Sequence, residues 1–272
     1  LLSRRQRQMC IRDRNKEVDL SVSCLGKVKE LKYDVIILPW GATEPHNLHL
    51  PYLTDCILPH DIAVEAAELA LSRSGVRCMV MPPVPFGAHN PGQRELPFCI
   101  HTRYATQQAI LEDIVSSLHV QGFRKLLILS GHGGNNFKGM IRDLAFEYPD
   151  FLIAAANWFE VVSPKGYFEA EIDDHAGESE TSVMMHYHPE LVNLAEAGDG
   201  ESKPFAIASL NEKVAWVPRH WDKATVDSGV GNPKKATAEK GERYVKPIVE
   251  KLAGLFEEMA QHDPVSYTHL PS

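Results

Sequence analysis

The segment from residue 35 to residue 55, VIILPWGATEPHNLHLPYLTD, joins an apolar run to a cluster of polar side chains. Val35 to Leu38 form the continuous apolar run that is typical of a buried strand in a parallel sheet. Two carboxylates and two imidazoles follow within residues 44–55, namely Glu44, His46, His49 and Asp55. Carboxylate oxygen together with histidine nitrogen suits a divalent transition metal such as zinc, manganese or iron. We therefore predict a metal-binding loop after a first strand, with a polar surface loop as the alternative.

Strand and helix patterns alternate along most of the remaining chain. Apolar residues at helical spacing predict helices over 58–74, 104–121, 137–148 and 236–261, and short apolar runs predict strands over 78–81, 125–129 and 151–156. This alternation, with short connections, indicates a parallel sheet covered by helices on both faces. Ligands in such sheets bind beyond the carboxyl ends of the strands, where Glu44 is expected. Residues 84–102 are expected to form a long loop, and residues 203–235 show no regular pattern.

Two further polar segments are placed to join the same site. Ser130 to Asn136, SGHGGNN, follows a predicted strand, and its glycines let the backbone approach a ligand closely. It lacks the lysine and the spacing of a phosphate-binding loop, so its central His132 suits a metal ligand better. The third segment, 174–182, reads DHAGESETS and offers His175, Glu178 and Glu180 near a helix start. Carboxylates in that position also serve as partners of the helix dipole, so a capping role is the alternative.

Composition and charge exclude several classes of protein. The 272 residues carry a formal net charge of −8, which argues against nucleic acid or an anionic membrane as the main partner. No apolar run approaches the ~18 residues of a membrane-spanning helix. The five cysteines are scattered without a CxxC pair, which is typical of reduced thiols in a cytoplasmic protein. We therefore expect a cytoplasmic enzyme or binding protein.

The two ends of the chain differ in character from the rest. Residues 4–14 and 265–270 back-translate to DNA that resembles a transposase-type sequencing adapter, in opposite orientations at the two ends. We therefore expect residues 1–14 and 264–272 to be adapter-derived artefacts and residues 15–263 to form a single domain. A basic targeting arm is the alternative for the first tail.

Together the three polar segments resemble the creatininase (creatinine amidohydrolase) family of metal hydrolases. The family patterns G-x-x-E-x-H-x-x-H-L-P-x-x-x-D, N-G-H-G-G-N and H-A-G-x-x-E-T-S recur in order at residues 41–55, 130–135 and 175–182, with serine at the first place of the second. The resemblance implies a three-layer α/β/α sandwich with a mainly parallel sheet. It also implies a homo-oligomer, commonly a hexamer.

The resemblance further implies two divalent metal ions per subunit (zinc, manganese or iron) and a role for each matched residue. Glu44, Asp55 and His132 would hold one ion, and His46 and the bridging Asp55 the other. The family's further glutamate ligand corresponds to Gly134, and we expect Glu178 to replace it, with Glu180 left open. His175 would transfer protons, with Glu178 as a second catalytic group, and Asn135 and Trp158 match substrate-binding positions.

These roles predict hydrolysis of a non-peptide or cyclic amide C–N bond by a water that two metal ions activate. The expected partner is a small amide substrate, with no nucleic acid and no membrane. A formamide deformylase or a short-peptide peptidase of the same family is the first alternative. A catalytically silent ligand-binding relative is the second, although the intact ligand set argues against it. The FPGT segment and a second tryptophan of creatininase itself are altered here, to LPFC at 96–99 and to Glu171, which argues against creatinine as the substrate.

Overall fold

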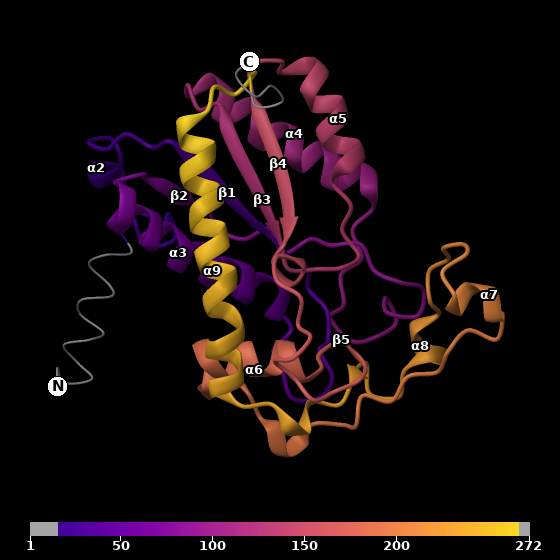
Figure 1. Ribbon diagram of the computed structural model, residues 1–272. Coiled ribbons are helices and arrows are strands. Elements are labelled where there is room, and N and C mark those ends of the chain that lie inside the picture. Colours follow the sequence, from indigo (N-terminus) through magenta and orange to yellow (C-terminus); the bar gives the residue numbers. More distant parts are fainter. Residues whose placement is uncertain (1–15, 267–272) are drawn as a thin grey trace, which may run out of the picture.

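The computed structural model describes residues 16–266, and a four-stranded parallel sheet forms its centre (Figure 1). The first proposed artefact, at residues 1–14, and most of the second lie outside the described residues. The strands are β1 (Val35–Trp40), β2 (Cys78–Val80), β3 (Lys125–Ser130) and β4 (Leu152–Asn157), in the order β2-β1-β3-β4. All three pairings are parallel, and Ile36 of β1 lies beside Leu126 of β3. The predicted mainly parallel sheet is confirmed.

Helices cover both faces of this sheet because alternate strand residues point to opposite sides. Val35 and Ile37 pack into one core with α3 (Thr54–Ser74) and α9 (Ala238–Gln261). Ile36 and Leu38 pack into a second core with α4 (Tyr104–Val120) and α5 (Lys138–Glu147). The three-layer α/β/α arrangement implied by the family resemblance is therefore confirmed.

The start of α3 differs from the predicted helix start because polar residues form its first turn. Helix α3 begins at Thr54, four residues before the predicted start, so that Asp55 stands in its first turn rather than in a loop. The helix ends at Gly75, whose φ of 77° is the left-handed conformation that glycine adopts without steric cost. Residues 84–102 form a long loop with isolated bridges, as expected.

Short elements make up much of the described chain outside the central sheet and its covering helices. Strand β5 (Asp173–His175) pairs antiparallel with β6 (Val230–Gly231), and α6 (Glu178–Tyr187) follows β5 directly. The remaining short elements are α2 (Leu25–Val28), α7 (Ala208–Asn211), α8 (Trp221–Ala224), and the 3-10 turns η1 (Trp158–Glu160), η2 (Pro189–Leu191), η3 (Leu194–Glu196) and η4 (Pro233–Lys235). Over residues 16–266, every helix is too short or too polar to cross a membrane.

Candidate metal centre

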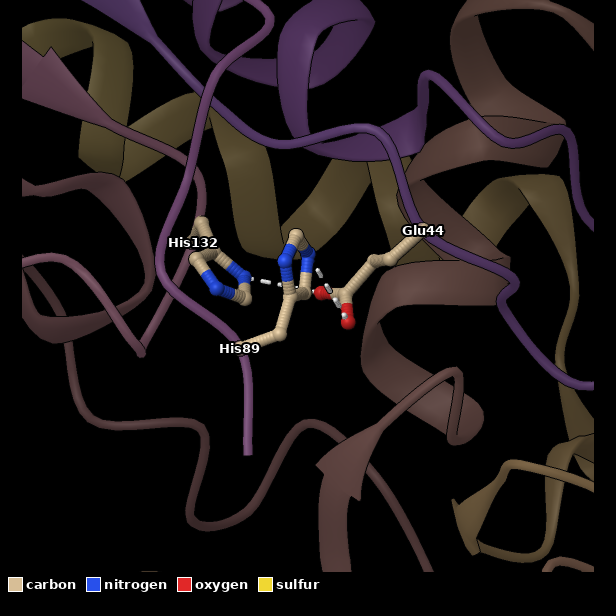
Figure 2. Close-up of side chains that lie close together, drawn as sticks. All are labelled: Glu44, His89 and His132. Carbon is tan, nitrogen blue, oxygen red and sulfur yellow. Dashed lines mark ion pairs between the residues drawn. The ribbon is translucent and has the colours of Figure 1, made fainter. Parts of the chain in front are cut away.

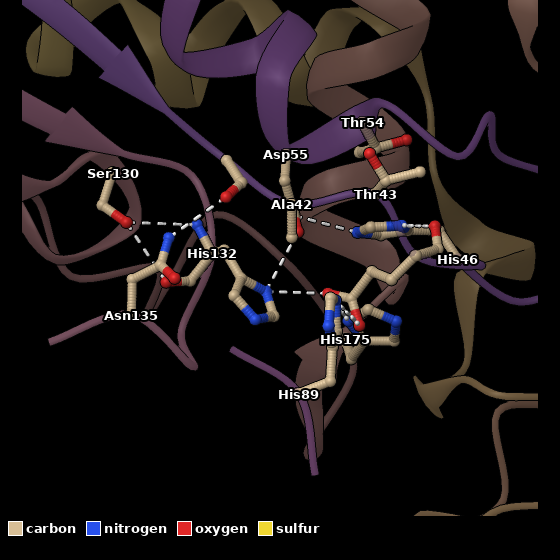
Figure 3. A network of polar contacts seen from close by, with 12 residues as sticks. Ala42, Thr43, His46, Thr54, Asp55, His89, Ser130, His132, Asn135 and His175 are labelled. Atoms are coloured by element: carbon tan, nitrogen blue, oxygen red, sulfur yellow. Dashed lines mark hydrogen bonds and ion pairs between the residues drawn. The ribbon is translucent and has the colours of Figure 1, made fainter. Parts of the chain in front are cut away.

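The three polar segments converge beyond the carboxyl ends of β1 and β3 (Figure 3). The loop after β1 carries Glu44 and His46, the first turn of α3 carries Asp55, and the turn after β3 carries His132. Glu44, His46 and Asp55 are almost fully buried. Gly41 and Gly131 make this convergence possible, because a Cβ on either would lie within 2.3 Å of the Asp55 carbonyl oxygen.

Asp55 links two halves of the centre with its two carboxylate oxygens. Its Oδ1 lies 3.0 Å from His46 Nε2, and its Oδ2 lies 3.0 Å from His132 Nδ1. Glu44 Oε1 lies 2.8 Å from the same His132 nitrogen. Asp55 Oδ2 and Glu44 Oε1 nevertheless receive no aligned hydrogen bond, although both are buried. Buried carboxylate oxygens without a donor are costly unless a cation neutralises them.

Three imidazoles are held so that one nitrogen of each points into the cluster. His46 Nδ1 contacts the Glu44 carbonyl at 3.1 Å, His132 Nε2 contacts the Ala88 carbonyl at 2.6 Å, and His175 Nε2 contacts the Pro45 carbonyl at 3.1 Å. A carbonyl only accepts, so the nitrogen that faces it carries the proton. The opposite nitrogen of each ring faces the carboxylates and would bind a metal ion once it is deprotonated, which is the usual arrangement around metal-binding histidines.

The electrostatics of the cluster favour a positive charge at its centre. Burial alone would lower the pKa of His46, but Asp55 and Glu180 raise it to about 10. Burial likewise opposes a charged Glu44, yet the neighbouring histidines His132 and His175 hold the pKa of that carboxyl well below its usual range. The residues thus stabilise a cation among the carboxylates, and a divalent ion fits this requirement.

Glu180 joins this cluster and Glu178 does not. Glu180 Oε1 lies 3.7 Å from His46 Nε2, and its other oxygen accepts from the Ala176 amide at 2.7 Å. The Glu178 carboxylate is used elsewhere: it accepts from the amides of Glu169 and Ala170 at 2.8 Å each and pairs with Lys240. The expectation that Glu178 supplies a ligand or a catalytic group stays a prediction, but these contacts count against it and favour Glu180. The fixed glutamate of the pattern H-A-G-x-x-E-T-S, which falls on Glu180, is the sequence signal that identifies the alternative.

Three overlapping groups of side chains have the spacing of a metal site. In each, the nearest ligand atoms lie within 4.8 Å of one another. The groups are Glu44, His89 and His132; Glu44, His46 and His175; and His46, Asp55 and Glu180. His89 comes from the loop over 84–102, for which solvent exposure is the ordinary expectation, and sequence reasoning missed its place beside Glu44. His49 lies outside these groups and contacts Thr181 Oγ1 at 2.8 Å.

Two cavities open on the cluster. A cavity of about 670 Å³ is lined by Glu44, His132 and His175 on one side and by Trp221 on another. A smaller one of about 220 Å³ reaches Trp158 and Glu180. The His175 ring stands edge-on against Trp221, with 5.2 Å between ring centroids. Trp221 belongs to the stretch that shows no sequence pattern, so its role was missed.

The two expected substrate-binding residues line these cavities: Asn135 lines the larger one and Trp158 the smaller one. Asn135 accepts from the Ala88 amide at 3.2 Å and donates to the Gly41 carbonyl at 3.1 Å. Its amide therefore ties two loops together at the edge of the larger cavity. Trp158 is 1 % exposed, and its indole nitrogen has no partner within the described residues.

Comparison with known proteins assigns the chain to a family. The family model for creatinine amidohydrolase matches residues 25–256. A mycofactocin precursor peptide peptidase of Mycolicibacterium smegmatis is 28% identical over 223 residues, which cover 80% of this chain and 83% of the relative. Creatinine amidohydrolase of Pseudomonas putida is 25% identical over 244 residues (82% and 89%), and 3-dehydro-scyllo-inosose hydrolase of Thermotoga maritima is 26% identical over 254 residues (85% and 79%).

Solved structures of creatininase share the fold. The crystal structure of creatinine amidohydrolase superposes with a TM-score of 0.74 at 22% identity and covers 91% of this chain and 99% of that one. A manganese form of creatininase gives a TM-score of 0.73 at 23% identity and covers 91% and 100%. Because the family model spans most of the chain and the three segments form one buried cluster, the protein is a hydrolase that belongs to the creatininase family.

Proposed function

We propose that the protein is a metal-dependent amidohydrolase that cleaves a non-peptide or cyclic amide C–N bond with two divalent ions bound at this centre. The observation that carries the proposal is that His46 Nε2 and His132 Nδ1 face buried carboxylates, while the other nitrogen of each ring faces a backbone carbonyl. Relatives named as amidohydrolase and peptidase support C–N bond hydrolysis, and a manganese form of creatininase supports a divalent metal. Zinc, manganese and iron all suit this set of nitrogen and oxygen donors.

The donor set divides into two halves that share Asp55. Glu44 and His132 would hold one ion, and His46 and Glu180 the other, with one Asp55 oxygen toward each half. The orphaned Glu44 Oε1 and Asp55 Oδ2 both lie beside His132 Nδ1 and support the first of these ions, since each is buried without a donor.

The residues around the centre supply positioning and proton transfer. When bound, the ions polarise the amide carbonyl and make a water nucleophilic near neutral pH. His175 faces both cavities and lies 4.0 Å from Glu44 Oε1. Its Nε2 proton is held by Pro45, so its Nδ1 accepts a proton and later delivers it to the leaving nitrogen. Trp221 packs edge-on against the ring and keeps this orientation.

A short-peptide peptidase is the second candidate, and the size of the larger cavity favours it. At about 670 Å³ it exceeds the needs of a single small ring and reaches the exposed Trp216 and the charged Arg219. The peptidase of Mycolicibacterium smegmatis is a relative of comparable length. A formamide deformylase shares the same chemistry and is distinguished by substrate alone.

Elemental analysis followed by a hydrolysis screen tests the proposal. The purified protein should carry divalent metal and should hydrolyse at least one of creatinine, a formamide series or a dipeptide library, with loss of activity on chelation and recovery on metal addition. His132→Ala and Asp55→Ala should lose both metal and activity while circular dichroism shows the fold retained. Full metal with no turnover across the screen would favour the silent ligand-binding relative, and full activity in either variant would refute the assignment.

A further inference from the structure

His89 is a buried histidine for which the described residues provide no hydrogen bond. Its side chain has no exposed surface, and neither Nδ1 nor Nε2 has a partner. Its Nε2 lies 3.6 Å from Glu44 Oε2, which is too far for a hydrogen bond. Its ring centroid lies 5.0 Å from that of His132. Figure 2 shows the His89 ring beside the Glu44 carboxylate and His132, which contact each other directly.

A buried imidazole without partners is costly unless the site contains something for it to bind. Burial removes both ring nitrogens of His89 from water, and neither gains a hydrogen bond in exchange. Ligands held ~2.1 Å from one tetrahedral ion lie ~3.4 Å from each other. The separation of 3.6 Å between His89 and Glu44 matches that spacing.

The backbone around His89 is built to bring this ring into the centre. The preceding Ala88 carbonyl receives the His132 Nε2 proton at 2.6 Å, and the Ala88 amide donates to Asn135. The His89 amide donates to His101 Nδ1 at 2.9 Å. A Cβ on Gly134 would meet the Ala88 carbonyl oxygen at 2.1 Å, so the glycine leaves the space that this loop enters.

From these contacts, and on the basis of the proposed function, we propose that His89 is a direct protein ligand of the ion held by Glu44 and His132. The same loop therefore does two things: Ala88 orients one imidazole ligand, and His89 supplies another. With His89 this half of the centre offers two nitrogens and oxygens from Glu44 and Asp55. An added imidazole favours zinc or iron(II) over manganese, because manganese prefers oxygen ligands.

Metal content and chelator competition in alanine variants test the assignment. Wild-type protein should hold two divalent ions per chain, and His89→Ala should bind one of them at least about tenfold more weakly in a competition with a chromogenic chelator. His101→Ala is the matched control, because it removes an imidazole that contacts the same loop but lies outside the three groups. The control removes only a contact to the His89 backbone, so it should retain both ions and lose clearly less affinity than His89→Ala.

Cobalt substitution of cysteine variants gives a direct readout of coordination. His89→Cys loaded with cobalt(II) should show a thiolate-to-cobalt charge-transfer absorption in the near ultraviolet, and His101→Cys should not. Circular dichroism verifies that each variant is folded. If His89→Ala is unstable, His89→Cys still tests the role of residue 89, because cysteine can itself bind the metal ion.

The outcomes separate this inference from the proposed function. Wild-type protein that binds no divalent ion would overturn both. Wild-type protein with two ions, together with His89→Ala that binds both at unchanged affinity and His89→Cys without the cobalt band, would overturn the role of His89 alone. Equal weakening in His89→Ala and His101→Ala without that band would also overturn it, since displacement of the loop would then be the cause.

Discussion

At the scale of single residues, helix geometry separates Glu178 from Glu180. Two residues along an α-helix differ by roughly 200° in direction, so these carboxylates leave α6 on opposite sides. Glu180 faces His46, whereas Glu178 faces Lys240 and the backbone at Glu169. We therefore expect the carboxylate nearer to the helix start to be a structural group and the one a half-turn later to be the metal ligand.

Substitution of each glutamate by glutamine should give opposite results. Glu180→Gln should weaken one of the two ions because it removes a negative donor beside His46, with little change in melting temperature of the metal-free protein. Glu178→Gln should retain both ions and lower the free energy of unfolding by about 1–3 kcal/mol, since it removes the charge that Lys240 contacts. Metal analysis and chemical denaturation of the two variants make the comparison. Loss of metal in Glu178→Gln, with metal retained in Glu180→Gln, would show that Glu178 is the ligand.

Gly134→Ala tests the close packing of the two loops. The added Cβ would lie 2.1 Å from the Ala88 carbonyl and 2.5 Å from His132 Nε2. We expect the loop to move and the His132 contact to Ala88 to break, with weaker metal binding. Gly133→Ala, whose Cβ has its nearest neighbour at 4.0 Å, is the control and should bind metal normally. Isothermal titration calorimetry measures the zinc affinity of each variant.

At the scale of elements, α9 closes the core by contact with α6 at a glycine. A Cβ on Gly241 would meet the Ser182 carbonyl oxygen at 2.0 Å, so the two helix backbones touch there. Ser182 Oγ also accepts from the Thr237 amide at 3.2 Å, at the start of α9. Because α6 carries Glu180, this contact fixes the position of one predicted ligand.

The two glycines of α9 should respond differently to alanine. Gly241→Ala should destabilise the protein by about 2 kcal/mol or more, because the helices must separate. Gly254→Ala should stabilise it by about 0.5–1 kcal/mol, because its Cβ meets nothing closer than Arg73 at 4.0 Å and alanine favours the helix. Thermal unfolding of the metal-free proteins gives the comparison, and equal effects would contradict the proposed helix contact.

A histidine–carboxylate network ties α3 to neighbouring segments and predicts a pH dependence. Burial would lower the pKa of His60, but Asp19 and Asp61 raise it to about 9, and Asp61 also raises the pKa of His188 to about 9. Above pH ~6.5, these histidines thus keep protons in the folded state that they release in the unfolded chain. This contribution to stability is complete below ~6.5 and is lost as the pH rises toward 9.

Denaturation between pH 6.5 and 9 measures the effect. The free energy of unfolding should fall by about 1–2 kcal/mol over this interval in the wild type. His60→Gln should reduce the slope, and the additional change His188→Gln should remove most of the remainder. A wild-type slope retained in the double variant would show that other groups are responsible.

At the scale of the whole molecule, the metal centre lies where segments from distant parts of the chain meet. Its buried carboxylates repel one another unless cations lie between them. Ligand binding to the folded state alone adds RT ln(1 + [L]/Kd) to stability, which is about 4 kcal/mol at a free metal concentration of 1,000 Kd.

Removal of metal should therefore lower the melting temperature by roughly 5–10 °C for a chain of this size. The measurement is differential scanning fluorimetry of protein stripped by chelator, with the chelator saturated with zinc as control. Restoration of the original melting temperature by zinc or manganese completes the test, and an unchanged temperature after verified stripping would argue against a metal at this site. The homo-oligomer stays a prediction that mass photometry checks.

The sequence by itself determined the elements and the three motif segments of this protein. Apolar runs such as Val35 to Leu38 and helical spacing in residues 236–261 are local patterns, and local patterns report burial directly. The spacing of Glu44, His46 and Asp55, together with His132 and His175, likewise indicated a metal centre of the creatininase kind before any contact was known. These residues lie in short segments whose position after a strand follows from the alternation of elements.

Only the tertiary structure decided which remaining side chains reach the centre. Glu178 and Glu180 were both open because the sequence does not state which face of α6 packs inward, and the contact at Gly241 fixes the face that brings Glu180 to His46. His89 lies in a loop without regular periodicity, and its direction depends on contacts with residues more than 40 positions away. Strands and helices bury one repeating face, so the spacing of their apolar residues shows in the sequence which face is buried. The conformation of a loop is set instead by contacts with distant residues, and no local sequence pattern predicts it.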